Sequence, residues 1–326
     1  MTELNVDVVC LGELLVDMFP AEIGRRLAEV TAFYPKPGGA PANVAAGIAR
    51  LGRRSAFIGK VGDDAFGHHL AAVLAAEAVE TRGMRFDSEA RTTMAFIASP
   101  DPNTNEYLFY RNPGADTRLR AEELDEALLR NCKALHFGSL SLVEEPIRSA
   151  ALRAVEIVVD SGGMVSLDVN YRPTLWSSAD AAYEAVMAII GRVDLLKVNE
   201  EELRLLTGES DPSVGGMALI KMGPKLCVMT SGTEGSHFAT VEGTGFVPAF
   251  PVKTVDATGC GDSFVAGLLS QLTAIEIQTT IPGVEQMQRI VSYANAVGAL
   301  TAQTKGVIPA LPNADAVEHF LASHHS

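Results

Sequence analysis

The sequence predicts an α/β fold in which helices flank a mainly parallel sheet on both sides, giving three layers. Short apolar runs rich in Val, Ile and Leu recur along the 326 residues, as in strands that are buried on both faces. Patterns typical of helices separate most of these runs, which implies right-handed crossovers between parallel strands. No internal repeat, low-complexity segment or long linker interrupts the alternation, so we expect one domain over residues 1–326.

The alternation can be followed from the N-terminus. The run at 6–11 is continuously apolar and β-branched, and the helical pattern at 42–51 precedes the next apolar run. Strands are expected at 6–11, 55–61, 134–137, 164–168, 193–198 and 226–230, and helices at 42–51, 66–77, 144–160, 179–191, 200–206 and 214–222. The C-terminal third is expected to hold a strand at 250–255, a glycine turn, a helix from about residue 259 and a last helix at 284–301.

Two stretches break the rhythm. Residues 30–35, and 92–99 with 107–111, have strand patterns without intervening helices, so they should form hairpins outside the main sheet. They could make an edge meander, or a small lid over a site, and we favour a β-lid drawn from about 13–36 and 91–111. Exposed lid edges invite pairing with a second copy, so we expect a homodimer through the lid strands.

Composition narrows the possible partners. The net charge of −14 and a pI near 4.9 argue against nucleic acid and against an anionic membrane. Cys10, Cys132, Cys227 and Cys260 form no C-x-x-C pair, so reduced thiols and a cytoplasmic location are expected. The N-terminus has acids where a signal peptide has basic residues, and no apolar run approaches the roughly 20 residues of a membrane helix.

The most informative segment is the glycine turn at 254–267. Gly259 and Gly261 precede a helix whose first N–H groups have no partners within the helix, which makes them a site for anions. Asp262 follows in the first helical turn, where a carboxylate can serve only to complement the helix dipole. That role needs neither two glycines nor a second acid at Asp256. Phosphoryl transfer explains the whole set: an N–H cradle stabilises the transferred group, and a nearby carboxylate accepts the hydroxyl proton.

Other glycine-rich motifs do not fit this turn. The sequence has no G-x-x-x-x-G-K-[ST], which excludes a P-loop. Gly259 and Gly261 could open a G-x-G-x-x-G, but Phe264 occupies the position of the third glycine. The turn also lies near the C-terminus rather than after the first strand, so a dinucleotide-binding dehydrogenase is not expected.

A second glycine-containing stretch offers a sugar site. Gly38 and Gly39 form a turn without side chains ahead of a helix, and Asn43 then projects from the first helical turn, where its amide can donate to and accept from hydroxyls. An ordinary turn before a helix would have the same pattern. Asp17 could accept hydroxyl bonds, although alone it would be read as a solvated loop acid. Arg111 and Arg172 each follow a strand-like run and could contact an oxyanion or serve as structural ion-pair partners.

Two further strand ends could face a nucleotide. Asn199 and Glu202 have the spacing of a capping box, which explains them structurally, although a Mg²⁺ or phosphate role at a strand end is also plausible. The turn from Thr230 to Gly235 could hold ribose and phosphates through its backbone, or simply be a hairpin turn.

Together these segments resemble the ribokinase-like (PfkB) carbohydrate kinase family over nearly the whole chain. The stretch G-G-A-P-A-N at 38–43 is similar to the family's N-terminal sugar-binding signature, and D-A-T-G-C-G-D at 256–262 resembles its C-terminal signature, D-T-x-G-A-G-D. Ala257 and Cys260 depart from that signature, but the loop acts through its backbone, so catalysis should survive. The resemblance implies that Asp262 is the catalytic base and that the backbone of Gly259, Cys260 and Gly261 forms the anion hole. It further implies that the sugar is bound by Asp17, Gly38, Gly39 and Asn43, and that Mg²⁺ and phosphate are bound near Asn199 and Glu202. The nucleotide would be contacted by Thr230, Gly232, Gly235 and Asn295, and K⁺ by Asp256 and the Thr258 carbonyl.

Within the family, the chain looks most like fructokinases at residues 12–17, 38–43, 109–116 and 170–176. The implied reaction is ATP plus D-fructose giving ADP and fructose 6-phosphate, with Mg²⁺ as cofactor and K⁺ as activator. The alternative substrate is 2-keto-3-deoxygluconate, whose kinases resemble this chain at the same arginines, so that Arg111 and Arg172 could face a sugar-acid carboxylate. A nucleoside or vitamin kinase of the same family and a non-catalytic sensor are further alternatives.

Overall fold

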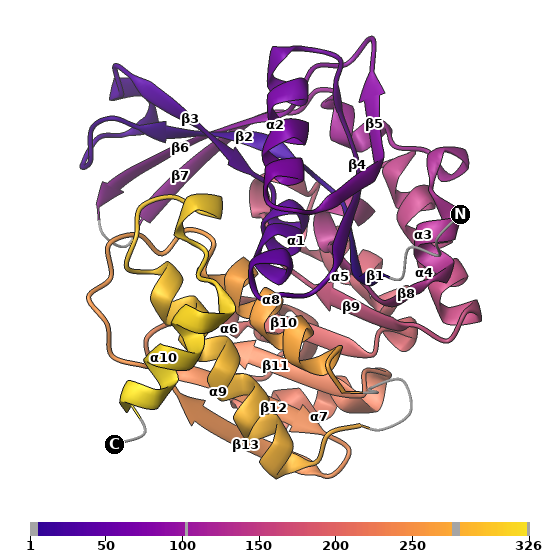
Figure 1. The fold of residues 1–326 in the computed structure, drawn as a ribbon, viewed down its shortest axis with the longest axis vertical. Helices are drawn as coiled ribbons and strands as arrows, with labels where there is room; N and C mark the ends of the chain where they lie inside the picture. Colours follow the sequence, from indigo (N-terminus) through magenta and orange to yellow (C-terminus); the bar gives the residue numbers. More distant parts are fainter. Residues whose placement is uncertain (1–5, 102–103, 276–280, 325–326) are drawn as a thin grey trace.

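The computed structural model describes residues 6–101, 104–275 and 281–324. Its centre is a sheet in the order β13-β12-β11-β10-β9-β8-β1-β4-β5, parallel from β11 through β5, with β12 and β13 added in antiparallel pairing (Figure 1). The strands are β1 Val6–Leu11, β4 Ser55–Gly62, β5 Glu80–Asp87, β8 Cys132–Gly138, β9 Met164–Asp168, β10 Leu195–Asn199, β11 Leu226–Thr230, β12 Gly235–Thr240 and β13 Gly243–Pro248. The mainly parallel sheet predicted from the sequence is confirmed.

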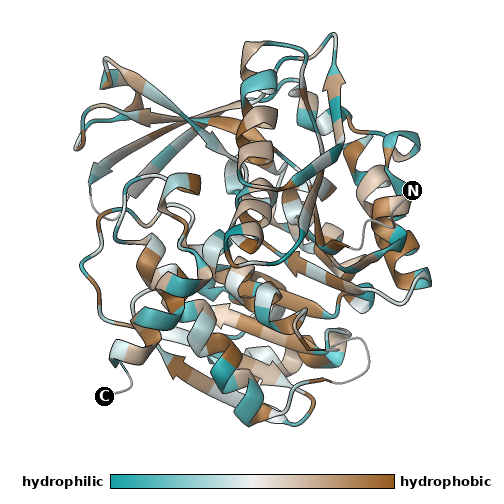
Figure 2. Cartoon of the chain, viewed as in Figure 1, coloured by the Kyte–Doolittle hydropathy of each residue, from teal (hydrophilic) through white to brown (hydrophobic). Residues whose placement is uncertain are grey.

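Helices cover both faces of this sheet. Because side chains alternate along a strand, Val8 and Cys10 of β1 pack on one face while Val9 and Leu11 pack on the other. Much of the hydrophobic colour in Figure 2 lies on these central strands and on the helices around them. One face is covered by α1 Ala40–Arg50, α2 Ala65–Ala76, α8 Cys260–Leu272, α9 Val284–Thr301 and α10 Ala314–His324, the other by α3 Glu126–Arg130, α4 Ile147–Asp160, α5 Ala179–Met187, α6 Glu200–Thr207 and α7 Pro212–Met222.

Side-chain caps fix where several helices begin. The Asp64 carboxylate accepts hydrogen bonds from two N–H groups at the start of α2, and Asp211 does the same for α7. Asn199 and Glu202 form the predicted capping box at the start of α6. In contrast, α1 and α8 follow Gly39 and Gly259, which have no side chain to cap a helix.

A second, smaller sheet stands beside the large one. Its order is β3-β2-β6-β7, with antiparallel pairs β2–β3 and β6–β7 and a parallel pair β2–β6. The strands are β2 Leu15–Pro20, β3 Phe33–Gly38, β6 Met94–Asp101 and β7 Thr104–Tyr110, and they project from the upper left of Figure 1. We call these four strands the lid sheet; their role as a lid stays a prediction.

The expected strand at 250–255 is wrong. That segment is an irregular connection: Phe250 packs edge-on against Phe320 of α10, Pro251 has no N–H to donate, and the Val255 N–H bonds to the Ala302 carbonyl. The place at the sheet edge is taken by β12 and β13, which the sequence patterns did not predict.

Other element boundaries shifted by a few residues. The helix expected at 144–160 begins only at Ile147, after Pro146, and the one expected at 179–191 ends at Met187, before a short 3₁₀ turn. The strand expected at 30–35 is β3, which begins at Phe33. Within the described part of the chain, no helix is both long and apolar enough to cross a membrane.

Candidate active site

The carboxyl ends of the parallel strands gather polar residues at one edge of the large sheet. Asp168 ends β9, Asn199 ends β10 and Thr230 ends β11, while Glu13 lies just beyond β1. Helices α1 and α8 both begin at this edge, and their close packing brings Gly47 against Ala266. Open α/β sheets bind ligands outside the carboxyl ends of their strands, so this edge is the candidate site.

The start of α8 is an open anion cradle. Gly259 has φ +77°, a left-handed conformation that favours glycine, and a Cβ there would collide with Val307. The Ser263 N–H bonds to the Gly259 carbonyl, and the Cys260 N–H makes a longer bond of 3.3 Å to Ala257. The N–H groups of Gly261 and Asp262 have no hydrogen-bond partner within the described residues. This is the set of unpaired donors that the sequence predicted.

Asp262 lies beside this cradle and is half-buried. Its Oδ2 accepts a hydrogen bond of 2.8 Å from the side-chain amide of Asn43, in the first turn of α1. Burial raises the pKa of Asp262 to about 6, with a smaller contribution in the same direction from Asp168; the Asn43 bond, Arg172 and Lys197 oppose the rise. A carboxylate with a pKa near neutrality is suited to take up a proton during turnover.

Asp17 enters the same region from the lid sheet. It lies on β2, and its carboxylate has no hydrogen-bond partner among the described residues. A Cβ at Gly38, on the neighbouring strand β3, would collide with Asp17 Oδ2, so the missing side chain leaves room for the carboxylate. Burial, and then the negative charges of Asp262 and Glu13, raise the pKa of Asp17 to about 7.

Glu13 is a site residue that the sequence analysis did not single out. It is buried; its Oε1 accepts a hydrogen bond of 3.0 Å from the Ala40 N–H, just after Gly39, and so caps α1 from a distance. Its Oε2 has no hydrogen-bond partner in the described structure, and neither does Oδ1 of buried Asn43. Buried polar atoms are normally paired, so these two oxygens mark places where a ligand can donate. The only sequence signal for Glu13 was its place in the stretch 12–17, which looks most like fructokinases.

The two arginines have different environments. Arg111 is buried, forms a 2.7 Å ion pair with Asp116 and donates a longer bond to the Leu140 carbonyl. Asp116 in turn accepts a hydrogen bond from Thr93, so this pair joins both ends of the β6–β7 hairpin to the large sheet. Arg172 is half-buried, has no ion pair within the described residues and lies in the electrostatic neighbourhood of both Asp17 and Asp262.

The residues predicted on the nucleotide side have structural partners. Both carboxylate oxygens of buried Glu202 accept backbone N–H bonds of 2.7 Å, from Tyr171 and from Asn199. The amide of Asn295 bridges Ser236 Oγ and the Val247 carbonyl, and so joins α9 to β12 and β13. Contacts of these three residues with a nucleotide or Mg²⁺ stay predictions.

Two turns complete this side of the site. Gly232 lies in the hairpin turn between β11 and β12, directly after Thr230 and Ser231, and the Ser231 N–H bonds to the Gly235 carbonyl. Asp256 accepts hydrogen bonds from the N–H of Thr258 and from the N–H of Gly306, which is 50 residues further along the chain. Asp256 therefore holds the loop that leads into the anion cradle.

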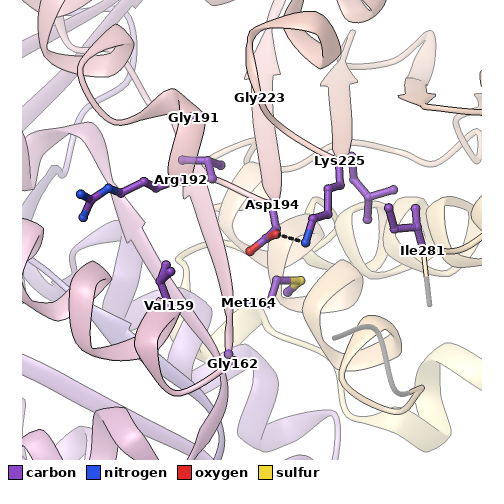
Figure 3. A pocket seen from close by; sticks show the side chains of 12 residues that line it. Val159, Gly162, Met164, Gly191, Arg192, Asp194, Gly223, Lys225 and Ile281 are labelled. Atoms are coloured by element: carbon purple, nitrogen blue, oxygen red, sulfur yellow. Dashed lines mark ion pairs between the residues drawn. The ribbon is translucent and has the colours of Figure 1, made fainter. Parts of the chain in front are cut away.

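A separate pocket of about 390 Å³ lies at the opposite edge of the sheet (Figure 3). Met164 and Leu226 line it at the starts of β9 and β11, and Asp194 forms a 2.7 Å ion pair with Lys225 across it. Because this pocket is at the amino ends of the strands, it is distinct from the candidate site. Within the described residues, no group of three or more His, Cys, Asp or Glu could hold a metal ion.

Known proteins that are similar to this chain match it over nearly its full length. The model of the pfkB family carbohydrate kinases matches residues 5–314. Fructokinase-2 of Solanum habrochaites is 42% identical over 94% of this chain and 93% of its own. A fructokinase of Xylella fastidiosa solved with bound ATP has a TM-score of 0.87 at 29% identity, covering 99% of this chain and 100% of the other. A fructokinase of Vibrio cholerae O395 solved with fructose, ADP and calcium has a TM-score of 0.87 at 34% identity, covering 97% and 99%.

Proposed function

The chain belongs to the pfkB family of carbohydrate kinases, and on this premise we propose that it transfers the terminal phosphoryl group of ATP to D-fructose, giving ADP and fructose 6-phosphate. The observation that carries the proposal is the position of Asp262. A half-buried carboxylate with a pKa near 6 stands beside two unpaired N–H groups at a helix start. A proton acceptor and an anion cradle are the two parts that phosphoryl transfer to a hydroxyl needs.

Each residue has a definite task in the proposed reaction. The Asp17 carboxylate and the free Asn43 oxygen accept hydrogen bonds from sugar hydroxyls. Asp262 accepts the proton of the hydroxyl that attacks, while the N–H groups of Gly261 and Asp262 stabilise the charge on the transferred group. The lid sheet, which carries Asp17, excludes water from the site.

The nucleotide is proposed to bind as MgATP. The unpaired N–H groups of α8 fit a phosphate. The chain offers no cluster of acidic ligands for a metal among its described residues, which fits an ion bound mainly by phosphate oxygens and water. When bound, Mg²⁺ neutralises charge on the phosphates. Asn199 and Glu202 would face this ion or the phosphates, and Thr230, Gly232, Gly235 and Asn295 the rest of the nucleotide.

The charges around the sugar position favour fructose over 2-keto-3-deoxygluconate. A sugar acid needs a cation for its carboxylate, but Arg111 is already neutralised by Asp116. Near Asp17 the electrostatic neighbours are two further carboxyl groups, Asp262 and Glu13, against the single guanidinium of Arg172. A neutral ketohexose avoids repulsion from these three acids.

A substrate panel tests the proposal. ADP release is followed with MgATP and each of fructose, 2-keto-3-deoxygluconate, ribose and adenosine. We expect kcat/KM for fructose to exceed the others by at least about tenfold. Higher activity with 2-keto-3-deoxygluconate or with adenosine would show that this compound, and not fructose, is the substrate. If no sugar causes ADP release, the protein would be a non-catalytic sensor.

We also propose a K⁺ site beside the anion cradle. The Thr258 carbonyl would be a ligand, together with Asp256, whose two oxygens already hold the loop through the N–H groups of Thr258 and Gly306. K⁺ would then act by holding the cradle in place. Turnover in KCl should exceed turnover in choline chloride at the same ionic strength. Equal rates in the two salts would contradict the proposed K⁺ site.

The remaining proposals concern assembly and location. Leu108 and Tyr110 lie on the same face of the lid sheet and are 47% and 63% exposed, a surface that a second lid sheet would cover in a homodimer. A monomer in light scattering at micromolar concentration would contradict this. Cys10, Cys132, Cys227 and Cys260 are all free thiols, which supports a reducing, cytoplasmic location.

A further inference from the structure

A buried ion pair lies directly beneath the anion cradle. Lys197 and Asp168 are register partners on the adjacent strands β10 and β9, and Lys197 Nζ is 3.1 Å from Asp168 Oδ1. Their side chains are only 8% and 5% exposed. The sequence analysis assigned no role to either residue, because each is one polar position in a strand that is otherwise apolar.

The ammonium group faces the first turn of α8, which is proposed to hold the phosphate. Lys197 Nζ lies 3.6 Å from the position that a Cβ on Gly261 would occupy, and among the described residues no other atom outside the adjoining part of α8 lies within 4 Å of that position. The N–H of Gly261 is one of the two unpaired donors of the cradle. A fixed positive charge and an unpaired N–H therefore meet at the same residue.

Stability alone is a weak reason for such a pair. Removing two charges from water costs several kcal/mol for each ion, and apolar residues of similar volume are often as stabilising as a buried ion pair. Buried charges near unpaired donors and a titrating carboxylate are instead typical of functional sites.

We propose that Lys197, held in place by Asp168, is a positioning residue for phosphoryl transfer: its charge keeps Asp262 ionised and adds to the field of the cradle. This inference rests on the proposed function, because it assumes that Asp262 is the base. Lys197 acts through Asp262 and the loop and need not touch the sugar.

Other charged and polar groups around Asp262 and Lys197 also influence whether Asp262 is ionised. Asn43 of α1 donates to it, and Arg172, after β9, is a second cation in its surroundings. Asp17 of β2 and Asp168 itself are anions facing it. Glu202 of α6 is a further anion facing Lys197, so it still counters the lysine charge when Asp168 is changed. His136 of β8, which bonds to Ser166, also neighbours the pair.

The two members of the pair should therefore have opposite effects on the base. Lys197→Met removes a cation and favours the protonated form of Asp262, while Asp168→Asn removes an anion and favours the ionised form. A purely structural role would impair both variants alike and would not separate them by pH.

The experiment is the pH profile of kcat from pH 5 to 9, with saturating fructose and MgATP, on the full chain. For Lys197→Met we expect the acid limb to move to higher pH by at least about half a unit and the plateau to fall by about tenfold. For Asp168→Asn the limb should move to lower pH. Lys225→Met is the matched control, because it breaks a lysine–aspartate pair at the other end of the same sheet (Figure 3) and should leave the limb in place.

The outcomes separate this inference from the proposed function. Limbs that stay at the wild-type pH, or that move in the same direction, overturn the inference, as does an equal shift in Lys225→Met. If Lys197→Met does not fold, judged by circular dichroism, the direction of the Asp168→Asn shift decides alone. If Asp262→Asn turns over normally, the base assignment itself is wrong, whatever the limbs do.

Discussion

The side chains of Asn43 and Asp262 are joined by a hydrogen bond of 2.8 Å that connects the first turns of α1 and α8. Both helices start after a glycine, which has no side chain of its own to cap the helix, at the same edge of the sheet. The bond is possible because the helices pack closely: a Cβ on Gly47 of α1 would lie 2.6 Å from the Cβ of Ala266 of α8. The sugar-side helix thus fixes the orientation of the carboxylate on the phosphate-side helix.

Replacing Asp262 by Asn tests the base. The amide keeps the size of the carboxylate but cannot take up the hydroxyl proton, so we expect kcat to fall by at least about 10²-fold. The N–H cradle is unchanged, so the Kd for MgATP, measured by calorimetry, should stay within about threefold of the wild-type value. Turnover within tenfold of the wild type would contradict the assignment of Asp262.

The pH dependence of turnover follows from the raised pKa of Asp262. The base must be ionised to act, so kcat should fall as pH drops through the folded pKa of about 6, approaching tenfold per unit below it. The Asn43 amide donates to the carboxylate and so stabilises its ionised form. Asn43→Ala should therefore move the acid limb to higher pH. A profile that stays flat down to pH 5 would show that a different group, or none, limits the reaction.

The sequence predicted the interior of the fold better than its edges. Strands such as β9 and β11 are buried on both faces and have continuous apolar runs, which left little ambiguity. The edge strand β13 has no such run, because most of its residues are at least partly exposed. Residues 250–255 have an apolar, β-branched pattern, but they pack on α10 and pair with no strand, a tertiary contact that no local pattern reveals.

The residues of the candidate site likewise differ in how well the sequence predicts them. Asp262 and the glycine turn could be predicted, because their chemistry lies within one short segment. Lys197 could not, since its role depends on Asp168 in the neighbouring strand and on Gly261 in the first turn of α8, more than 60 residues away. For Glu202, the capping box that the sequence predicted uses one carboxylate oxygen, and the N–H of Tyr171 takes the other, a long-range contact that no local pattern reveals.

Gly38 provides a test of the sugar site. Its backbone suits any residue, but a Cβ there would collide with Asp17 Oδ2. Gly38→Ala should therefore displace the Asp17 carboxylate and raise KM for fructose by at least about tenfold, with a smaller effect on KM for MgATP. Gly191→Ala is the matched control, because nothing lies within 4 Å of its Cβ position and it is far from the site. An unchanged KM for fructose in Gly38→Ala would show that Asp17 does not bind the sugar.

The two arginines should separate stability from catalysis. Arg111→Met leaves the buried carboxyl groups of Asp116 and Glu13 without their cation, and breaking a buried pair from one side costs about 3–5 kcal/mol in the free energy of unfolding. Arg172 has no ion pair to lose within the described residues, so Arg172→Met should unfold within about 1 kcal/mol of the wild type.

For activity we expect the reverse order. Arg172 is a cation near both Asp17 and Asp262, so Arg172→Met should lower kcat/KM for fructose by at least about fivefold while the protein stays folded. Urea unfolding and steady-state kinetics on the same samples measure both quantities, with the exposed Arg289→Met as control. A stable Arg111→Met with a selective loss of substrate affinity would show instead that Arg111 binds the substrate, as expected for a site that holds a sugar-acid carboxylate.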